Sequence, residues 1–478
     1  MTLPTTPMNR LTIQLDEIRA AQAAEPHSTI KKRLERIGRV EAMLRANEEK
    51  LCKAVAADFG HRHPIETQLA ELSQIYQACR YTKKYLKEWL KPVHLETPAY
   101  LSSSTAWMQA QPKGIVGIMS PWNYPILLAL APAIAALAAG NRVWLKPSER
   151  SSRTSGFLAT HIQEYFHFTE FSVTTGDANT AADFAALPFD HLFFSGSTAV
   201  GKKVMRAAAD NLVPVTLELG GKSPALVDTS ANLFDVASSI VYGKLLNSGQ
   251  TCIAPDYVLV EEQQHDALLA ELMKAAQRQF ATPEMLTGPI DPEQTARWHF
   301  LVEDAIAHGA TATPLLEPST KSERVFEPVA LSNVSPESAV MQEEIFGPIL
   351  PIVTVTNGTS STTSMIDFIN RGSSPTPLAL YWFGKNKVNL NRVIADTRSG
   401  GITVNDVLLH AACDGIPFGG IGSSGMGSYH GKAGFDAFSH LKPVLQVRGL
   451  FGLNWLRGTS VVHPPYGKKV ARLLKQLK

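Results

Sequence analysis

Residues 114–119 read Gly-Ile-Val-Gly-Ile-Met, and residues 142–146 read Arg-Val-Trp-Leu-Lys. Between these apolar runs, segment 125–139 is rich in alanine and leucine, begins with a proline and is followed by Gly140. Proline in the first turn and glycine just past the end are typical of a helix. The pattern predicts a strand, a helix and a strand over about 33 residues, the length of a right-handed crossover between parallel strands.

The same alternation continues along most of the chain. After this unit, we expect helices at 154–166 and 178–187 and strands at 171–175 and 191–194. After residue 252 we expect strands at 257–260, 325–330, 349–355, 378–383 and 401–405, and helices at 263–280, 291–308, 364–369 and 388–397. Such alternation predicts an α/β protein, and the length is enough for two or three domains.

The N-terminal region has a different pattern. Residues 1–27 are polar and contain three prolines, so we expect a loose leader with one amphipathic piece at 11–24. Apolar residues at helical spacing then predict scaffold helices at 28–53 and 65–90. Residues 92–110 are rich in Ser and Thr and favour short β pieces.

Parallel sheets of this kind bind ligands beyond the carboxyl ends of their strands. Asn123 and Lys146 lie at two such ends. The strand at 191–194 opens into Ser-Gly-Ser-Thr-Ala-Val-Gly at 195–201, which is not the six-position GxGxxG fingerprint and is weak by itself. Gly196 nevertheless permits close backbone approach, and the following helix offers unpaired N–H donors that suit a pyrophosphate.

Two residues in the middle of the chain are candidates for catalytic chemistry. Glu218 closes the apolar run 214–217, and Cys252 follows the turn Gly-Gln-Thr at 249–251. A thiolate attacks carbonyl carbon, and a carboxylate at a strand end can activate water. Taken singly, a cysteine is more often a small buried hydrophobic residue and a glutamate a solvated charge. The pair gains weight only from other motifs.

Seven motifs in one order resemble those of the aldehyde dehydrogenase superfamily, over about residues 30–445. They are Pro121-Trp122-Asn123, Lys146-Pro147-Ser148-Glu149, Phe194-Ser195-Gly196-Ser197 with Gly201, Leu217–Lys222, Gly249–Cys252, Glu343–Pro348 and Pro417–Gly420. Finer signatures resemble the class 3 branch and, within it, the bacterial coniferyl aldehyde dehydrogenases. They are Asp58–Arg62, Tyr429-His430-Gly431 and Pro464–Gly467.

The resemblance implies a Rossmann-like parallel-sheet cofactor domain, an α/β catalytic domain and a small β oligomerisation element. The expected boundaries are 1–91 and 111–219 for the NAD(P)-binding domain, 220–409 for the catalytic domain, 92–110 and 410–450 for the oligomerisation element, and 451–478 for a basic tail. The family uses the β element to build a dimer, so a homodimer is expected.

The resemblance also implies the roles of individual residues. Cys252 is the expected nucleophile, Glu218 the base that activates the hydrolytic water, and Asn123 a donor in the oxyanion hole. The expected cofactor contacts are Trp122, Lys146, Ser148, Glu149, Gly196, Ser197, Gly201, Leu219, Glu344 and Phe346. Because a carboxylate near the adenosine ribose repels a 2′-phosphate, Glu149 favours NAD over NADP, although class 3 members often accept both.

The implied reaction is NAD(P)-dependent oxidation of an aldehyde to a carboxylic acid through a thiohemiacetal and a thioester. Because Glu218 is present, the thioester is expected to be hydrolysed rather than transferred to coenzyme A. The expected substrates are phenylpropenals such as coniferaldehyde, or medium-chain aliphatic aldehydes. Residues expected near the mouth of the substrate tunnel are His410, Cys413, Ile416 and Phe418.

Two other functions are compatible with parts of this pattern. A thiol esterase would use Cys252 without redox chemistry, but it would not need the nucleotide motifs. A crystallin-like structural protein on the same fold would be expected to lack Cys252 or Glu218, and both are present.

The composition argues against several other classes of protein. Among 478 residues, 45 are Lys or Arg and 43 are Asp or Glu, which argues against nucleic acid as the main partner. The four cysteines form no CxxC pair, so we expect free thiols, no metal site and a cytoplasmic location. Residues 1–10 do not resemble a signal peptide, and the longest apolar stretch, 126–139, is too short to span a bilayer.

The C-terminal end is basic, with no acidic residue after Asp436. Val470, Leu473, Leu474 and Leu477 recur at helical spacing and predict a basic amphipathic helix. We favour packing of this helix over a neighbouring surface or the substrate mouth, as in related class 3 tails. Contact with an anionic membrane is the less favoured alternative.

Overall fold

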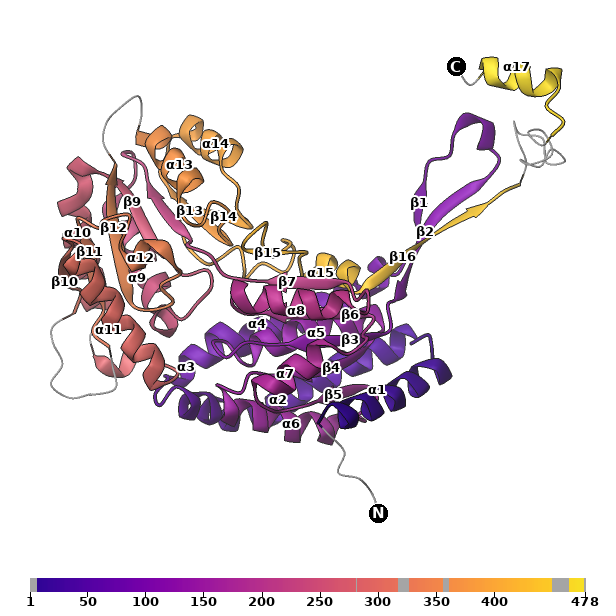
Figure 1. The fold of residues 1–478 in the computed structure, drawn as a ribbon, viewed down its shortest axis with the longest axis horizontal. Coiled ribbons are helices and arrows are strands. Elements are labelled where there is room, and N and C mark those ends of the chain that lie inside the picture. Colours follow the sequence, from indigo (N-terminus) through magenta and orange to yellow (C-terminus); the bar gives the residue numbers. More distant parts are fainter. Residues whose placement is uncertain (1–6, 281, 317–325, 356–360, 449–463, 477–478) are drawn as a thin grey trace.

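The computed structural model describes residues 7–280, 282–316, 326–355, 361–448 and 464–476. Figure 1 shows two lobes side by side, each built on its own sheet, and a slender three-stranded arm that projects from one of them. We call them the six-stranded lobe, which carries the N-terminal helices, and the seven-stranded lobe. Helices cover the sheets in both lobes, so the predicted α/β class is confirmed.

The six-stranded sheet has the strand order β15-β7-β6-β3-β4-β5. Its strands are β3 (Ile115–Met119), β4 (Arg142–Lys146), β5 (Phe171–Val173), β6 (His191–Ser195), β7 (Val215–Glu218) and β15 (Gly425–Met426). The first five pair in parallel, whereas β15 returns from far along the chain and pairs antiparallel with β7. The carboxyl ends of β3, β6 and β7 therefore meet at one edge of the sheet.

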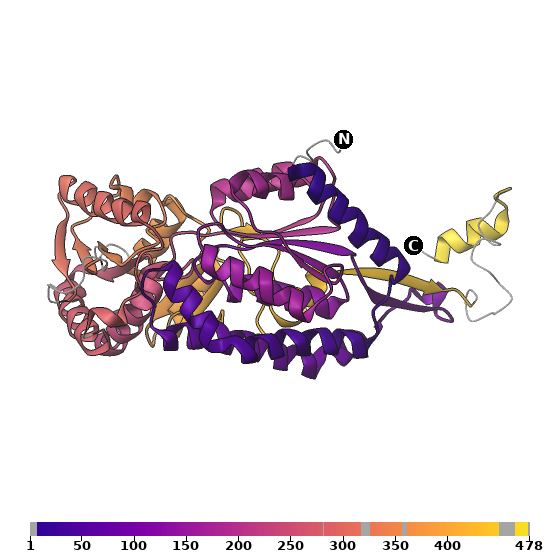
Figure 2. The ribbon, with the colours of Figure 1, turned by 90° about the horizontal axis from the view of Figure 1, so that it is seen from below.

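Helices lie on both sides of this sheet. One side carries α2 (Ile30–Asp58), α4 (Ser73–Trp89), α5 (Leu127–Ala139) and α6 (Ser152–Tyr165), and the other carries α1 (Pro7–Ala24), α7 (Ala178–Ala185) and α8 (Thr198–Ala209). Figure 2 shows the indigo helix α1 on the opposite face of the sheet from α2. The short helix α3 (Pro64–Thr67) and a π-helical turn (Gln68–Leu72) lead into α4.

The amphipathic piece predicted at 11–24 forms most of helix α1, but the helix is docked on the sheet and is not part of a loose leader. Leu11, Leu15 and Ile18 are buried in the same apolar cluster as Ile115 and Trp144 of the sheet. This stripe at helical spacing removes apolar surface from water on docking, which stabilises the helix as part of the lobe.

The crossover unit forms as predicted, with one change at the start of its helix. Gly140 ends α5 with φ 96°, a left-handed conformation that glycine adopts at no steric cost. The helix begins at Leu127 rather than at Pro125, and the Glu71 carboxylate accepts the N–H groups of Ile126 and Leu127 at 2.7 and 2.9 Å.

The seven-stranded sheet has the order β10-β11-β12-β9-β8-β13-β14, and all neighbours are parallel except β10 and β11. Its strands are β8 (Pro224–Val227), β9 (Tyr257–Glu261), β10 (Thr311–Pro314), β11 (Val329–Ser332), β12 (Ile349–Val355), β13 (Ala379–Phe383) and β14 (Gly401–Val404). Helices α9 (Leu233–Leu245) and α10 (His265–Gln279) pack on one face, and α11 (Pro292–Ala307), α12 (Ala339–Gln342), α13 (Ser361–Arg371) and α14 (Lys387–Asp396) lie on the other side. Strands β8 and β10 had not been predicted.

The arm consists of β1 (Val93–Leu95), β2 (Thr105–Pro112) and β16 (Ser439–Gln446), with β2 in the middle. Just before β16, α15 (Gly431–Ala437) packs on α5 in the body of the six-stranded lobe. Figure 1 shows α17 (Lys468–Gln476) beyond the tip of the arm, away from both lobes. Leu477, the last residue of the predicted apolar face, lies outside the described residues.

Candidate active site

A cavity of about 380 Å³ between the two lobes collects most of the predicted site residues, and we call it the crevice. It lies at the carboxyl edge of β3, β6 and β7, where ligands of parallel sheets bind. Predicted residues in its lining are Trp122, Asn123, Gly196, Ser197, Glu218, Leu219, Cys252, Glu344 and Phe346. Lys146, Ser148, Glu149 and Gly201 were also predicted but are not among the lining residues.

Cys252 follows a backbone loop with a rare conformation. Asn247, Ser248 and Gly249 have φ values of 53°, 51° and 73°, so three successive residues are left-handed. This conformation is costly for the two residues that carry side chains, and it persists only where surrounding contacts fix it. A Cβ on Gly249 would collide with the carbonyl of Gly347, so the loop passes too close to its neighbour for any other residue.

Asn123 contacts this loop directly. Its side-chain amide donates to the Gln250 carbonyl at 3.1 Å, which leaves the second amide hydrogen for an oxyanion in the crevice. The Asn247 side chain ties the two segments together, because its amide donates to the carbonyls of Asn123 and Gln250 at 3.0 and 3.1 Å. The predicted amide donor and the predicted nucleophile therefore lie on segments that are bonded to each other.

The environment of Cys252 favours a protonated thiol. Burial, followed by the nearby Glu344 and Glu218 carboxyls, raises the pKa of the Cys252 thiol to about 12, although hydrogen bonds from the N–H groups of Cys252 and Ile253 act in the opposite direction. The thiol therefore needs a base to take its proton as it attacks.

Glu218, the last residue of β7, is such a base. Its side chain is buried, and neither carboxyl oxygen has a hydrogen-bond partner among the described residues. Desolvation raises the pKa of Glu218 well above its ordinary value. A buried carboxylate without partners is a stronger base than a solvated one, and unsatisfied buried groups of this kind are rare outside functional sites.

The loop between β6 and α8 fits a dinucleotide. Ser197 caps α8, with its hydroxyl accepting the Val200 N–H at 3.3 Å, and the helix N-terminus opens on the crevice. Anionic groups bind well at such an end. The glycines serve packing as well: a Cβ on Gly196 would collide with the Phe194 ring, and one on Gly201 with Leu219.

Lys146, Ser148 and Glu149 form a second group beside the crevice. The buried Lys146 ammonium contacts the half-exposed Glu149 carboxylate at 3.1 Å, so a paired cation and anion are available to sugar hydroxyls. The Ser148 hydroxyl accepts the Arg150 N–H at 3.2 Å, so it bonds within its own turn.

Glu344 and Phe346 form the opposite wall of the crevice. The Glu344 carboxyl packs against Gly220, where a Cβ would collide with it. Burial, followed by the charge of Asp256, raises the pKa of Glu344 to about 8. Its Oε1 atom has no hydrogen-bond partner among the described residues, so it is free to accept from a bound hydroxyl. The rings of Phe346 and Trp122 meet edge to face at 5.4 Å.

Arg150, Gln294 and Arg297 also line the crevice but were missed by the sequence analysis. The Arg150 guanidinium lies 4.8 Å from the centre of the Trp122 ring and pairs with Asp291, the cap of α11 in the other lobe. Two side chains from the first turns of α11 bind the backbone of the segment that carries Phe346. Gln294 donates to the Phe346 carbonyl at 2.9 Å, and Arg297 donates to the Ile345 carbonyl at 2.6 Å. The spacing of Gln294 and Arg297 by three residues on an Asp-Pro-capped helix was the available signal.

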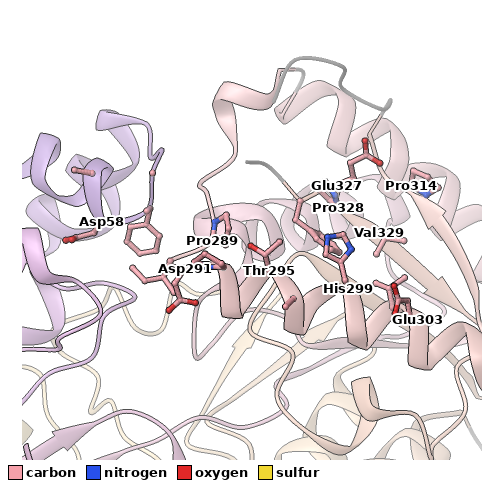
Figure 3. Close-up of a pocket in the computed structure, with 18 residues that line it drawn as sticks. Asp58, Pro289, Asp291, Thr295, His299, Glu303, Pro314, Glu327, Pro328 and Val329 are labelled. Atoms are coloured by element: carbon pink, nitrogen blue, oxygen red, sulfur yellow. The ribbon is translucent and has the colours of Figure 1, made fainter. Parts of the chain in front are cut away.

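A larger hollow of about 1040 Å³ lies elsewhere at the junction of the lobes and contains none of the predicted site residues. Figure 3 shows Asp58 on one side of it and Asp291 and His299 on the other. Both aspartates are engaged in capping, because Asp58 accepts N–H groups at the start of α6 and Asp291 accepts the Gln294 N–H. We therefore assign the chemistry to the smaller crevice.

Neither a metal site nor a membrane-spanning helix is found among the residues that the structure describes. Within them, no group of three or more His, Cys, Asp or Glu side chains is arranged to hold a metal ion. Likewise, none of the described helices combines the length and apolar character needed to cross a bilayer.

Comparison with known proteins identifies the family. The family model described as "Aldehyde dehydrogenase family" matches residues 13–444. Coniferyl aldehyde dehydrogenase from a Pseudomonas species is 42% identical, covering 97% of this chain and 95% of that protein. The dog enzyme named "Aldehyde dehydrogenase, dimeric NADP-preferring" is 35% identical, covering 97% of this chain and all of the relative.

A solved structure gives the same answer for the fold. The substrate-bound state of AldH from Staphylococcus aureus superposes with a TM-score of 0.89 at 34% identity, and each chain is covered completely. The match includes both lobes, the crevice between them and the arm. This chain belongs to the aldehyde dehydrogenase family, whose members oxidise aldehydes to carboxylic acids with NAD(P).

Proposed function

We propose that this protein oxidises a phenylpropenal such as coniferaldehyde to its carboxylic acid, with Cys252 as the nucleophile. The observation that carries the proposal is the meeting of Cys252, Glu218 and Asn123 in one crevice beside the N-terminus of α8. The 42% identical coniferyl aldehyde dehydrogenase supports an aromatic substrate, and a medium-chain aliphatic aldehyde is the second candidate.

The first step is attack of the Cys252 sulfur on the aldehyde carbon. Glu218 takes the thiol proton, directly or through water, because its raised pKa makes it a strong base in a dry site. The tetrahedral oxyanion accepts hydrogen bonds from the free amide hydrogen of Asn123 and from the Cys252 N–H. Each donor of this kind contributes about 3 kcal/mol to transition-state stabilisation.

A nicotinamide dinucleotide held in the crevice would supply the acceptor for the hydride that the thiohemiacetal must lose. The product on the enzyme is then a thioester on Cys252. Once Glu218 has passed the thiol proton to solvent, it removes a proton from the water that attacks the thioester carbon. The C–S bond then breaks to release the acid, and the sulfur is protonated again. The two unpartnered oxygens of Glu218 suit this role, since either can accept from water.

For the cofactor, we propose contacts at three places. The N-terminus of α8 binds the pyrophosphate, Lys146 and Glu149 bind the adenosine ribose, and Glu344 with Phe346 binds the nicotinamide ribose and ring. The negative charge of Glu149 beside the ribose supports a preference for NAD. The 35% identical relative named NADP-preferring supports NADP as the alternative.

We also propose that the chain forms a homodimer through its arm and that it resides in the cytoplasm. On β16, Leu441 and Leu445 are 40% and 50% exposed, and an exposed apolar edge strand favours pairing with a second chain. The basic helix α17 lies at the far end of this arm, where a neighbouring subunit would be met. All four cysteines are free thiols, which supports a reducing compartment.

The test measures the oxidation of a panel of aldehydes from hexanal to coniferaldehyde, each with NAD and with NADP. The absorbance of the reduced nicotinamide reports the rate of each reaction. We expect the highest kcat/KM with coniferaldehyde and NAD, and formation of the acid in amounts equal to reduced cofactor. Turnover of esters without any aldehyde oxidation would instead make the protein a thiol esterase. A lack of both activities would favour a structural role.

A further inference from the structure

A buried charged cluster lies behind the crevice and has no role in the reaction described above. It consists of Arg62, Glu66 and Glu71, and we call it the Arg62 cluster. The side chains of Arg62 and Glu71 are 0% exposed and that of Glu66 is 9% exposed. Arg62 joins the two carboxylates, donating to Glu66 at 3.1 Å and to Glu71 at 3.0 Å.

Through Glu71, the cluster holds the segment that carries Asn123. One oxygen of Glu71 accepts from Arg62, and the other accepts the N–H groups of Ile126 and Leu127. These groups begin α5, and a carboxylate at a helix N-terminus is bound by both hydrogen bonds and the helix dipole. Asn123 lies just before this anchored turn.

Through Glu66, the same cluster holds the loop that carries Cys252. A single oxygen of Glu66 accepts from Arg62, from the Asn247 N–H at 3.0 Å and from the Thr287 hydroxyl at 2.9 Å. Asn247 is the first of the three left-handed residues before Cys252. A strained loop needs such an external contact to keep its conformation.

A third contact links the cluster to the residue next to the nucleophile. The Arg62 guanidinium lies 5.1 Å from the centre of the Tyr124 ring, and the Tyr124 hydroxyl bonds with the Thr251 hydroxyl at 2.7 Å. Arg62 is therefore connected with the Asn123 segment and with the Cys252 loop by separate routes.

We propose that Arg62, with Glu66 and Glu71, is a positioning device that sets the Asn123 amide against the Cys252 sulfur and so builds the oxyanion hole. The proposal rests on the proposed function of that site. Buried ion pairs add little net stability, whereas they fix one geometry at the expense of others. Rigid placement of oxyanion donors is what such catalysis requires.

The test compares Arg62→Met and Arg62→Lys with Arg36→Met. Arg36 is a buried arginine that pairs with Glu170 at 3.0 Å and serves as the structural control. Glu170 directly precedes β5, so this pair lies at the amino end of the sheet, opposite the edge that carries the crevice. We expect Arg62→Met to lower kcat for the best aldehyde about 10- to 100-fold, with the KM for NAD changed less than twofold. Arg62→Lys keeps the charge but not the fork that joins two carboxylates, so an intermediate loss is expected.

A double-mutant cycle with Asn123→Ala separates positioning from general loss of structure. If Arg62 acts through Asn123, Arg62→Met lowers kcat less than about threefold in the Asn123→Ala background. An equal loss in both backgrounds, or an equal loss in Arg36→Met, would overturn the proposal. The wild-type aldehyde panel tests the proposed function separately, because all these results are ratios to wild type.

Milder variants keep the proposal testable if Arg62→Met does not fold. Thr287→Val removes one contact of Glu66, and Glu66→Gln removes its charge while keeping an acceptor for the Asn247 N–H. We expect each to reduce kcat about three- to tenfold without lowering the thermal midpoint more than Arg36→Met does. Unchanged kcat in both variants would contradict a positioning role.

Discussion

The Arg62 cluster and the crevice both contact the loop 247–252, and both contain buried charged groups. In the Arg62 cluster, both carboxylates and two of the three guanidinium nitrogens have partners. In the crevice, Glu218 has none among the described residues, and one oxygen of Glu344 has none. Paired groups hold neighbouring segments in one geometry, whereas unpaired groups remain available to react with a substrate or to bind a ligand in the crevice.

The difference has an energetic meaning. A buried polar group without a partner costs roughly 1–3 kcal/mol, so each unpaired group lowers the stability of the free protein. Enzymes tolerate this cost where a ligand completes the interactions. If pairing distinguishes these groups, substitutions at unpaired groups should change activity more than stability, and substitutions at paired groups should change stability.

Replacing the nucleophile should give the largest loss. We expect Cys252→Ala to lower aldehyde oxidation at least about 10⁴-fold, because no covalent intermediate forms. Cys79→Ala is the matched control, since Cys79 is a free thiol in α4 outside the crevice, and the activity of this variant should remain near wild type. Reduced-cofactor absorbance measures both, and activity that survives in Cys252→Ala would exclude the covalent mechanism.

Glu218→Gln should uncouple the two halves of the reaction. We expect a slowed burst of reduced cofactor, because another base such as hydroxide must take the thiol proton. Turnover after the burst should be about 10²- to 10⁴-fold slower than wild type, because hydrolysis of the thioester also lacks its base. The wild type should lose activity as the pH falls through the raised pKa of Glu218, since only the ionised form accepts a proton. Stopped-flow traces across the pH range should lack this loss of activity in Glu218→Gln. Unchanged steady-state hydrolysis in Glu218→Gln would contradict the role of Glu218 as the base.

Asn123→Ala removes one oxyanion donor and leaves the other. The expected loss in kcat is about 10²- to 10³-fold, with little change in the KM for NAD, because the amide acts on charge that develops in the transition state. Steady-state kinetics on the best aldehyde measure it. A change in KM alone would mean that Asn123 binds substrate rather than the oxyanion.

Two buried lysines, one unpaired and one paired, extend this comparison to the stability of the fold. Lys244 has no hydrogen-bond partner among the described residues, and burial lowers its pKa from 10.5 to about 8, whereas Lys222 pairs with Asp256. Below pH 8 the fold holds the charged form of Lys244 at a cost of about 3 kcal/mol, and this cost is relieved as the pH rises from 8 to 10.5. We therefore expect Lys244→Met to raise the thermal midpoint at pH 7 and to gain little at pH 10.

Lys222→Met is the matched control and should act in the opposite direction. It leaves the buried Asp256 without its cation, a change that costs about 3–5 kcal/mol. Thermal midpoints at the two pH values measure both variants. Equal destabilisation by the two substitutions would show that pairing does not distinguish these sites.

The smallest effect is expected at the half-exposed Glu149. Glu149→Gln keeps an acceptor for Lys146 but removes the charge that repels a 2′-phosphate. We expect the ratio of kcat/KM for NADP to that for NAD to rise about three- to tenfold. An unchanged ratio would place the cofactor preference elsewhere in the crevice.

Local signals in the sequence predicted most of the helices and strands. The resemblance to the aldehyde dehydrogenase superfamily supplied the expected site residues, of which nine line the crevice, and their roles stay predictions. The apolar run before Glu218 and the turn before Cys252 each fix a local conformation, and parallel strands bring their carboxyl ends together. The Arg62 cluster could not be predicted in this way. Glu66 resembles an ordinary surface glutamate, and the Asn247 N–H that it accepts comes 181 residues later.

Other misses have the same origin. Helix α1 was expected to be loose because nothing within it shows that Leu11, Leu15 and Ile18 dock on a sheet formed much later in the chain. Arg150 has no local mark of function, since its role depends on Trp122 and on Asp291 across the lobe junction. Contacts between distant segments depend on tertiary packing, which local patterns do not specify.

The antiparallel pairing of β15 with β7 limits how early in translation the sheet that carries Glu218 can be completed. Gly425 pairs with Glu218 itself, and the Leu219 N–H donates to the Ser424 carbonyl at 3.0 Å. The strand that bears the base therefore has an open edge until residues 424–426 have been synthesised. A nascent chain arrested before residue 424 holds Cys252 and Glu218 but lacks the strand that covers this edge, so the sheet beside the crevice cannot be completed before that point.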